Sequence, residues 1–204
     1  MTIDFGSLEQ RVGDAMSMDR VHVEWMLAVM QKLRPQTVVE IGCFAGVSTT
    51  AIAAAYDCGA IKKAHLIDIS IQDSVRAIAD ARPGFSVHQS PSVVALPAIS
   101  AEGDVMVVVD GDHEMQAVTH ELPIVLALHP RCIVAHDVTA EAAGFSKCDG
   151  ARWLWEQLQA GGWHCAVDCR RRHGASTHRG LLVACRGESD AAVARQELLT
   201  LGGQ

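Results

Sequence analysis

The sequence has one tyrosine in 204 residues and no apolar run that approaches the length of a membrane span. Its first residues lack the basic and then apolar pattern of a signal peptide. The seven cysteines are odd in number, form no C-x-x-C pair and are scattered along the chain, which is typical of reduced thiols. These absences predict an intracellular, cytoplasmic protein that does not contact a membrane.

The chain also lacks the positive charge that a nucleic-acid partner requires. Its formal net charge is −7, whereas a phosphate backbone binds to a basic face. The run at 170–172 is a local exception, RRR, and we interpret it as a solvated loop between two strands. A zinc site built from Cys165, Cys169, His173 and His178 is an alternative use of this region, but its spacing matches no common structural zinc site.

Apolar runs alternate with helical patterns along the whole chain, which indicates a single α/β domain. We predict a doubly wound, Rossmann-like, mostly parallel seven-stranded sheet that ends in an antiparallel hairpin. The expected strands are 38–41, 64–69, 85–89, 105–109, 132–135, 163–169 and 180–185. Residues 1–35 are expected to form a helical cap over one end of the pocket, 36–187 the core, and 188–204 a tail with a last helix. The segment 138–150 is a candidate lid.

The chain is organised around residues 37–50, which read TVVEIGCFAGVSTT. A β-branched run is followed by Gly42 and Gly46, which bracket a tight turn. Ser48 and Thr49 then supply oxygens where a helix would start. A strand, a glycine turn and a helix N-terminus form the floor of a ligand pocket, although the same succession also occurs without function in α/β proteins.

The spacing of the glycines and one carboxylate distinguish between classes of ligand. A dinucleotide fingerprint requires G-x-G-x-x-G, whereas this turn reads G-x-x-x-G. Glu40 directly precedes the turn, and its carboxylate would repel a pyrophosphate but suits the ammonium group of an amino-acid-like cofactor.

Two further residues extend this pocket along the neighbouring strands. Asp68 ends the second predicted strand and is placed to accept both hydroxyls of a ribose; its alternative role is to cap the following helix. Ser90 follows the third strand, where an adenine would lie if the ribose sits on Asp68.

The second informative stretch begins at residue 104, DVMVVVDGDHEMQAVTHE. The most hydrophobic run of the chain ends in Asp110, Asp112 and His113, and the next strand ends in His136 and Asp137. Ionisable groups at strand ends are typical of a ligand-binding rim. If the two strands are neighbours, Asp110 and Asp137 lie side by side.

Together the E-x-G-x-x-x-G, DGDH and HD motifs resemble the class I S-adenosylmethionine (SAM) methyltransferases. They are similar to a subgroup of natural-product O-methyltransferases, of the macrolide-sugar O-methyltransferase and cephalosporin-hydroxylase type. The resemblance covers roughly residues 36–185. It implies that the cofactor is SAM and that the acceptor is a small molecule with a hydroxyl group; a homo-oligomer is left open.

The resemblance also implies roles for individual residues. Glu40, Gly42 and Gly46 would contact the methionine part of SAM, with Ser48 and Asp110 beside them, and Asp68 would contact the ribose. Asp110 and Asp137 match positions that hold a divalent metal, commonly magnesium. His113 matches a histidine suggested as the general base.

One position departs from this pattern. Related catechol-type enzymes have asparagine directly after the second metal-binding aspartate, whereas this sequence has Val138. His136 could replace that ligand, but an imidazole suits a softer metal than magnesium. The sequence therefore leaves open whether the protein depends on a metal.

Methyl transfer from a sulfonium needs an acceptor whose proton leaves as the methyl group arrives, and either a cation or an imidazole can take that part. His113 is our candidate base, with Asp110 and Asp112 to raise its basicity; capping the next helix is its alternative role. Two other functions share the fold. An NAD(P)-dependent oxidoreductase would need a third glycine, and Tyr56 has no lysine four residues on. A non-catalytic SAM-binding protein would need neither His113 nor Asp137.

Overall fold

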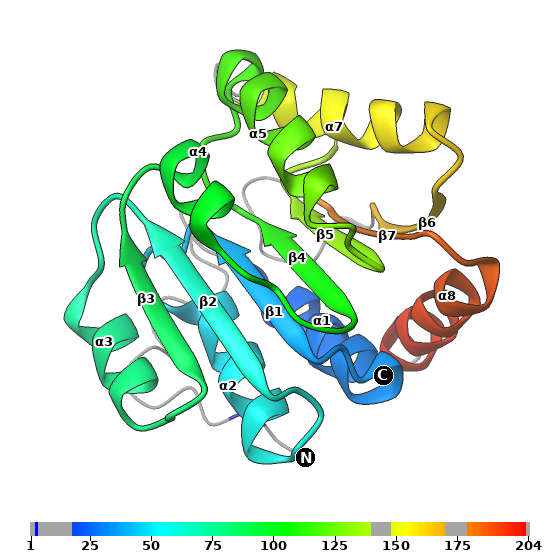
Figure 1. Ribbon diagram of the computed structural model, residues 1–204. Helices are drawn as coiled ribbons and strands as arrows, with labels where there is room; N and C mark the ends of the chain where they lie inside the picture. Colours follow the sequence, from blue (N-terminus) through cyan, green and yellow to red (C-terminus); the bar gives the residue numbers. More distant parts are fainter. Residues whose placement is uncertain (1–2, 4–17, 140–147, 170–178, 203–204) are drawn as a thin grey trace.

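The computed structural model describes residues 3, 18–139, 148–169 and 179–202 and shows a seven-stranded sheet between two layers of helices (Figure 1). The strands are β1 (Thr37–Ile41), β2 (Lys63–Asp68), β3 (Phe85–Gln89), β4 (Val105–Val109), β5 (Cys132–His136), β6 (His164–Asp168) and β7 (Leu181–Cys185). The helices are α1 (Arg20–Leu33), α2 (Val47–Asp57), α3 (Asp73–Asp80), α4 (Ser92–Ala95), the short 3-10 helix η2 (Leu96–Ala98), α5 (Met115–Ala127), α7 (Asp149–Ala160) and α8 (Glu188–Gly202).

The strand order is β3-β2-β1-β4-β5-β7-β6. The first five strands in this order are parallel, whereas β7 runs antiparallel to both β5 and β6. The predicted doubly wound sheet with a terminal antiparallel hairpin is confirmed. Because the first five strands are parallel, their carboxyl ends share one edge of the sheet. The strand order reverses its direction between β1 and β4.

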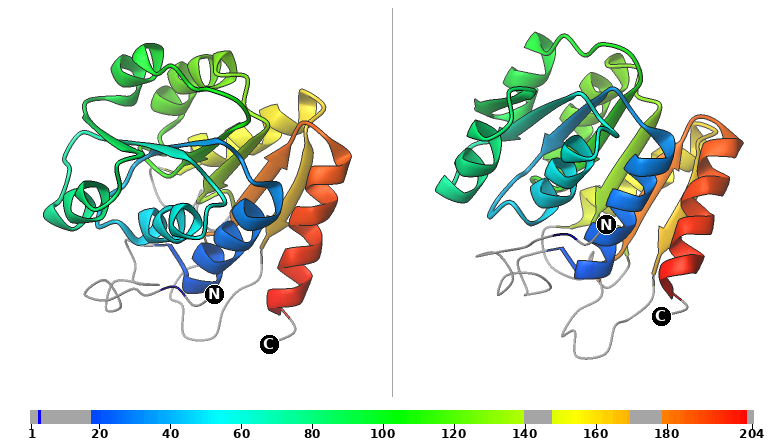
Figure 2. Two further views of the ribbon diagram at one scale, coloured as in Figure 1. Left: turned by 60° about the horizontal axis from the view of Figure 1, so that its bottom comes forward. Right: turned by 90° about the horizontal axis from the view of Figure 1, so that it is seen from below.

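Alternate residues of each central strand pack against opposite helical layers, as the period of a strand requires. In β4, Met106 and Val108 join the core beneath α1, α2, α3 and α8, whereas Val105, Val107 and Val109 join the core beneath α4, α5 and α7. Figure 2 shows the first layer of helices side by side along one face of the sheet. All five residues of β4 are buried, which explains why its sequence shows no polar alternation.

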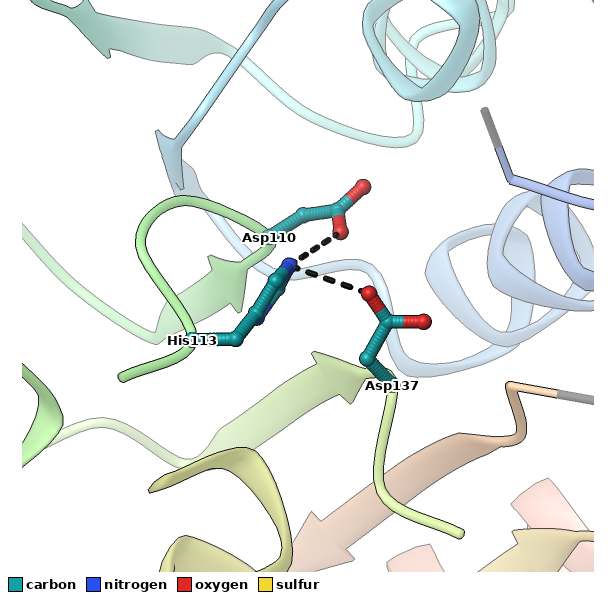
Figure 3. Close-up of side chains that lie close together, drawn as sticks. All are labelled: Asp110, His113 and Asp137. Carbon is teal, nitrogen blue, oxygen red and sulfur yellow. Dashed lines mark ion pairs between the residues drawn. The ribbon is translucent and has the colours of Figure 1, made fainter. Parts of the chain in front are cut away.

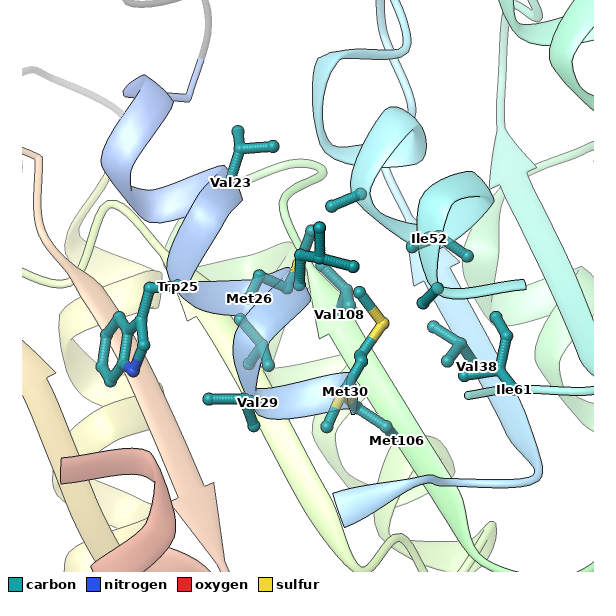
Figure 4. Close-up of a cluster of buried hydrophobic side chains, with 14 of the residues drawn as sticks. Val23, Trp25, Met26, Val29, Met30, Val38, Ile52, Ile61, Met106 and Val108 are labelled. Carbon is teal, nitrogen blue, oxygen red and sulfur yellow. The ribbon is translucent and has the colours of Figure 1, made fainter. Parts of the chain in front are cut away.

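Helix α1 is held to the sheet by large apolar side chains (Figure 4). Trp25, Met26 and Met30 are completely buried between α1 and its neighbours. The indole N–H of Trp25 donates to the backbone carbonyl of Ala194 at 2.9 Å, so α1 and α8 are joined by a buried hydrogen bond. Helix α1 is thus packed into the helical layer, and Met18, two residues before it, reaches the pocket described below.

Several expectations differ in detail from the structure or lie outside its described part. The helix expected near 92–99 is divided into α4 and η2, because Pro97 lacks the N–H group that would continue an α-helix. Several segments and residues lie outside the described part of the chain: residues 7–17 of the expected N-terminal helix, most of the candidate lid, the 170–172 run, His173 and His178.

All seven cysteines are free thiols. Within the described ranges, none of the helices combines the length and the apolar character needed to cross a membrane.

Candidate functional site

A cavity of about 770 Å³ opens at the carboxyl edge of the parallel strands. Its walls include Gly42, Asp68, Ser90, Asp110 and His113, which follow or end four different strands. Sites for small ligands occupy roughly 300–1,000 Å³ and occur where an open α/β sheet changes its strand order. The residues predicted from separate motifs are therefore brought together at one cavity.

The glycine turn between β1 and α2 depends on the absence of a side chain at Gly42. Gly42 has φ of 83°, and a Cβ atom there would lie 2.2 Å from the carbonyl oxygen of Asp110. Gly46, the residue directly before α2, has φ of 88°. The β1–α2 turn therefore lies directly against the loop that follows β4, and only glycine leaves enough room for this contact at position 42.

The side chain of Glu40 lies beneath the turn rather than in the cavity wall. It is completely buried, and its two carboxylate oxygens accept hydrogen bonds from the Ser48 hydroxyl at 2.5 Å and the Thr49 hydroxyl at 2.7 Å. Burial raises the pKa of Glu40 to about 7, against the lowering effect of these two hydroxyls, and the negative charge of Asp110 adds to the rise. Glu40 and Ser48 thus tie β1 to the first turn of α2, and neither is among the residues that line the cavity.

Asp68 fastens the glycine turn from the neighbouring strand. Its Oδ2 atom accepts the backbone N–H groups of Cys43 and Phe44, each at 2.9 Å, and its Oδ1 atom accepts that of Ser70 at 3.0 Å. A carboxylate has about four acceptor positions, so about one remains for a ligand. Ser90 lies beside it, since its N–H donates to the Asp68 carbonyl at 3.0 Å, and both residues line the cavity.

The acidic groups that follow β4 and β5 converge on His113 (Figure 3). Strands β4 and β5 are paired, as expected. The Nε2 atom of His113 lies 3.2 Å from Oδ2 of Asp137 and 3.6 Å from Oδ1 of Asp110. Because Asp137 is fully buried and His113 lines the cavity, the Asp137 carboxylate holds the imidazole from the protein side. Asp112 accepts the N–H of Glu114 instead, so it shapes the loop.

His136 belongs to the same cluster and faces the same oxygen of Asp110 as His113 does. Its Nδ1 atom lies 3.2 Å from Oδ1 of Asp110, and its ring meets that of His22 in an edge-on contact with centroids 5.7 Å apart. Burial lowers the pKa of His136, but the carboxylates of Asp110 and Asp137 outweigh burial and leave it above its ordinary value. The sequence assigned no role to His22, which is completely buried beside this cluster.

Arg179 is a cavity-lining residue that the sequence patterns did not identify. Its Nη1 atom lies 2.9 Å from Oδ2 of Asp137. It stands two residues before β7, and Leu181 at the start of β7 is opposite His136 in the register. The predicted antiparallel direction of β7 could have indicated Arg179, because it brings the first residues of β7 to the carboxyl end of β5.

The donors for a divalent metal can be tested against this geometry. Asp110, His113 and Asp137 each offer one atom, and these atoms lie within 4.8 Å of one another, while His136 is not part of the set. Magnesium prefers six oxygen ligands in an octahedron. Two carboxylates and an imidazole, with apolar Val138 next to them and a guanidinium already on Asp137, do not fit that ion as they stand.

Comparison with known proteins is consistent with this fold and cavity. Residues 39–138, from within β1 to the residue after Asp137, match a family model described as a methyltransferase domain. No curated protein matches the chain.

Three solved structures share the architecture at low sequence identity. An O-methyltransferase from Bacillus cereus in complex with SAH has a TM-score of 0.64 at 16% identity, over 85% of this chain and 84% of that one. A cofactor-bound protein from MTB has a TM-score of 0.67 at 15% identity, over 85% and 84%. The O-methyltransferase TomG from Streptomyces achromogenes, involved in tomaymycin synthesis and solved with SAM, has a TM-score of 0.58 at 19% identity, over 84% and 82%.

Proposed function

We propose that this chain, which carries a methyltransferase domain at residues 39–138 in the fold of the class I SAM-dependent enzymes, transfers a methyl group from SAM to a hydroxyl of a small molecule. The observation that carries the proposal is the placement of His113 on the cavity wall, held by Asp110 and Asp137, on the same sheet edge as the glycine turn.

The charge of the cavity favours a cationic cofactor. Its wall includes five acidic residues and one arginine among the described residues: Asp68, Asp110, Asp112, Glu114, Glu121 and Arg179. A sulfonium and an ammonium group gain from such a wall, whereas the pyrophosphate of a dinucleotide is repelled by it. This sign of charge and the G-x-x-x-G spacing are the reasons for preferring SAM to NAD(P).

Each cofactor-binding residue then has a part that fits its position. Gly42 and Gly46 let the backbone approach the methionine portion, and Glu40 and Ser48 support that turn from beneath. Asp68 has room to accept one ribose hydroxyl, and Ser90 lies next to it at the expected adenine position. Asp110 faces the donor from the β4 side.

His113 serves as the general base in this proposal. Both carboxylates face its Nε2 atom, which favours the tautomer that carries the proton there. Nδ1 is then the nitrogen that accepts the acceptor's hydroxyl proton. As that O–H bond breaks, the oxygen attacks the methyl carbon, the S–C bond cleaves with its electron pair on sulfur, and S-adenosylhomocysteine leaves. No step is assigned to a metal.

Replacing His113 by glutamine tests the catalytic assignment. The variant keeps a polar side chain of similar size but cannot take the proton, so we expect kcat to fall by about 10²–10⁴-fold with SAM binding retained. Turnover would be followed by transfer of labelled methyl to a panel of hydroxyl compounds, and SAM binding by calorimetry. His164→Gln, at an exposed histidine paired with Glu188, is the matched control.

The outcomes separate the candidate functions. Unchanged turnover in the His113 variant would remove the histidine from the mechanism. Binding of SAM without methylation of any compound by the unaltered protein favours a non-catalytic SAM-binding role. If calorimetry finds no binding of SAM or S-adenosylhomocysteine, the proposed function is wrong.

A further inference from the structure

The cation at the acidic cluster is supplied by the chain itself. Asp137 is completely buried, and a buried carboxylate is costly unless a positive group pairs with it. Arg179 meets this need, because the Nη1 atom of its guanidinium lies 2.9 Å from Oδ2 of Asp137. The side chain of Arg179 is 21% exposed and lines the cavity, so it belongs both to the buried pair and to the ligand-facing surface.

Arg179 contacts the oxygen of Asp137 that faces His113, another of the three candidate metal donors (Figure 3). Oδ2 of Asp137 is also the atom nearest to Nε2 of His113, at 3.2 Å. A divalent ion at a normal coordination distance from that oxygen would lie within about 5 Å of Nη1 of Arg179. Two like charges at this distance inside a partly buried site repel strongly. A metal ion and the guanidinium of Arg179 in its observed position would therefore compete for the negative charge of Asp137.

The position of Arg179 is fixed by backbone contacts that do not involve a ligand. The N–H of Thr139 donates to the Arg179 carbonyl at 3.1 Å, and the N–H of Asp137 donates to the Gly180 carbonyl at 3.0 Å. Gly180 has φ of 72°, and a Cβ atom there would lie 2.3 Å from the Thr139 methyl carbon. These contacts hold the start of β7 against the residues that follow β5.

We propose that Arg179 takes the place of a divalent metal at this site, so that the protein works with a fixed guanidinium between Asp137 and the acceptor. The role in the reaction rests on the proposed function, whereas the competition between arginine and metal does not. Val138 supplies no ligand, which fits a site whose cation is covalently part of the chain. Arg179 then neutralises Asp137 and offers positive charge on the side where the acceptor oxygen becomes negative.

Titration with Mn²⁺ tests this without a known acceptor. Protein stripped with a chelator would be titrated by calorimetry and by electron paramagnetic resonance of free Mn²⁺. We expect the unaltered protein and Arg179→Lys, which keeps the charge, to show no site up to millimolar Mn²⁺. Arg179→Gln removes the positive charge and with it the repulsion. We expect this variant to bind Mn²⁺ with a Kd at least about tenfold below the millimolar limit reached with the unaltered protein. Adding Asp137→Asn should abolish the new site.

A matched control is Arg152→Gln, which removes one positive charge from an exposed pair with Glu156 and should leave Mn²⁺ binding unchanged. Submillimolar Mn²⁺ binding by the unaltered protein overturns the proposal, even if an Arg179 variant does not fold. So does a folded Arg179→Gln variant that still binds no Mn²⁺. SAM binding, measured on the same samples, tests the proposed function separately. If the unaltered protein does not bind SAM, the proposed function is wrong, but the result of the Mn²⁺ titration still holds.

Discussion

Glu40 should make the protein less stable as the pH rises, and this dependence can be isolated by one substitution. The carboxyl group is fully buried beneath the glycine turn, and burial raises its pKa from the usual 4.5 to about 7. Because the folded protein holds this proton more tightly than the unfolded chain does, its stabilising contribution is complete below pH 4.5. That contribution is lost as the pH rises through about 7.

The size of the effect follows from the pKa difference. At about 1.36 kcal/mol for each unit, a carboxyl that moves from 4.5 to about 7 changes the free energy of unfolding by about 3 kcal/mol. Glutamine has the same shape but does not titrate, and it can still accept one of the two hydrogen bonds from Ser48 and Thr49. We expect the unaltered protein to lose about 3 kcal/mol relative to Glu40→Gln between pH 4.5 and pH 8.

Urea unfolding of both proteins at a series of pH values measures this difference directly. Glu156→Gln removes a carboxylate whose side chain is 55% exposed and serves as the control for loss of charge alone. Parallel pH profiles for the unaltered protein and Glu40→Gln would refute the reasoning, since they would mean that the buried carboxyl keeps its ordinary pKa.

Two further substitutions probe the packing around the site. Gly42→Ala should cost several kcal/mol and abolish SAM binding, because its Cβ would meet the Asp110 carbonyl; Gly59→Ala, at φ of 74° with nothing within 4 Å, should cost only about 1–2 kcal/mol, and thermal unfolding with calorimetry compares them. Trp25→Phe removes the buried hydrogen bond to Ala194 and should lower the free energy of unfolding by about 1–3 kcal/mol in urea; an unchanged value would show that water replaces the indole.

The sheet was predictable from the sequence because four of its strands, β1, β4, β5 and β7, are buried along their whole length and read as mostly apolar runs between helical segments. The run at 105–109 has no polar residue, and a strand buried on both faces has no other pattern available. The prediction that Asp110 lies beside Asp137 was made on the condition that β4 and β5 are neighbours, and the structure pairs these two strands. The prediction of which strand ends meet therefore needed no side-chain detail.

What the sequence could not give is the direction of individual side chains. Glu40 was expected to contact a cofactor, which stays a prediction; in the structure its carboxylate accepts hydrogen bonds from the hydroxyls of Ser48 and Thr49, eight and nine residues on. That pairing depends on the exact curvature of the turn between them, where Phe44, a non-glycine residue, has φ of 42°. Motif spacing reports that a carboxylate precedes the turn but leaves open on which side of the backbone it lies.

The chemistry of the acidic cluster follows from the antiparallel strand β7. In a wholly parallel sheet, a strand beside β5 would begin at the opposite edge, far from Asp137. Because β7 runs the other way, its first residues arrive at the carboxyl end of β5 and bring Arg179 to a buried carboxylate. Asp137 has φ of 61°, a conformation that aspartate tolerates better than most residues, and its N–H is held by the Gly180 carbonyl. The reversed strand therefore both holds the backbone of Asp137 and supplies the positive charge that pairs with its buried side chain.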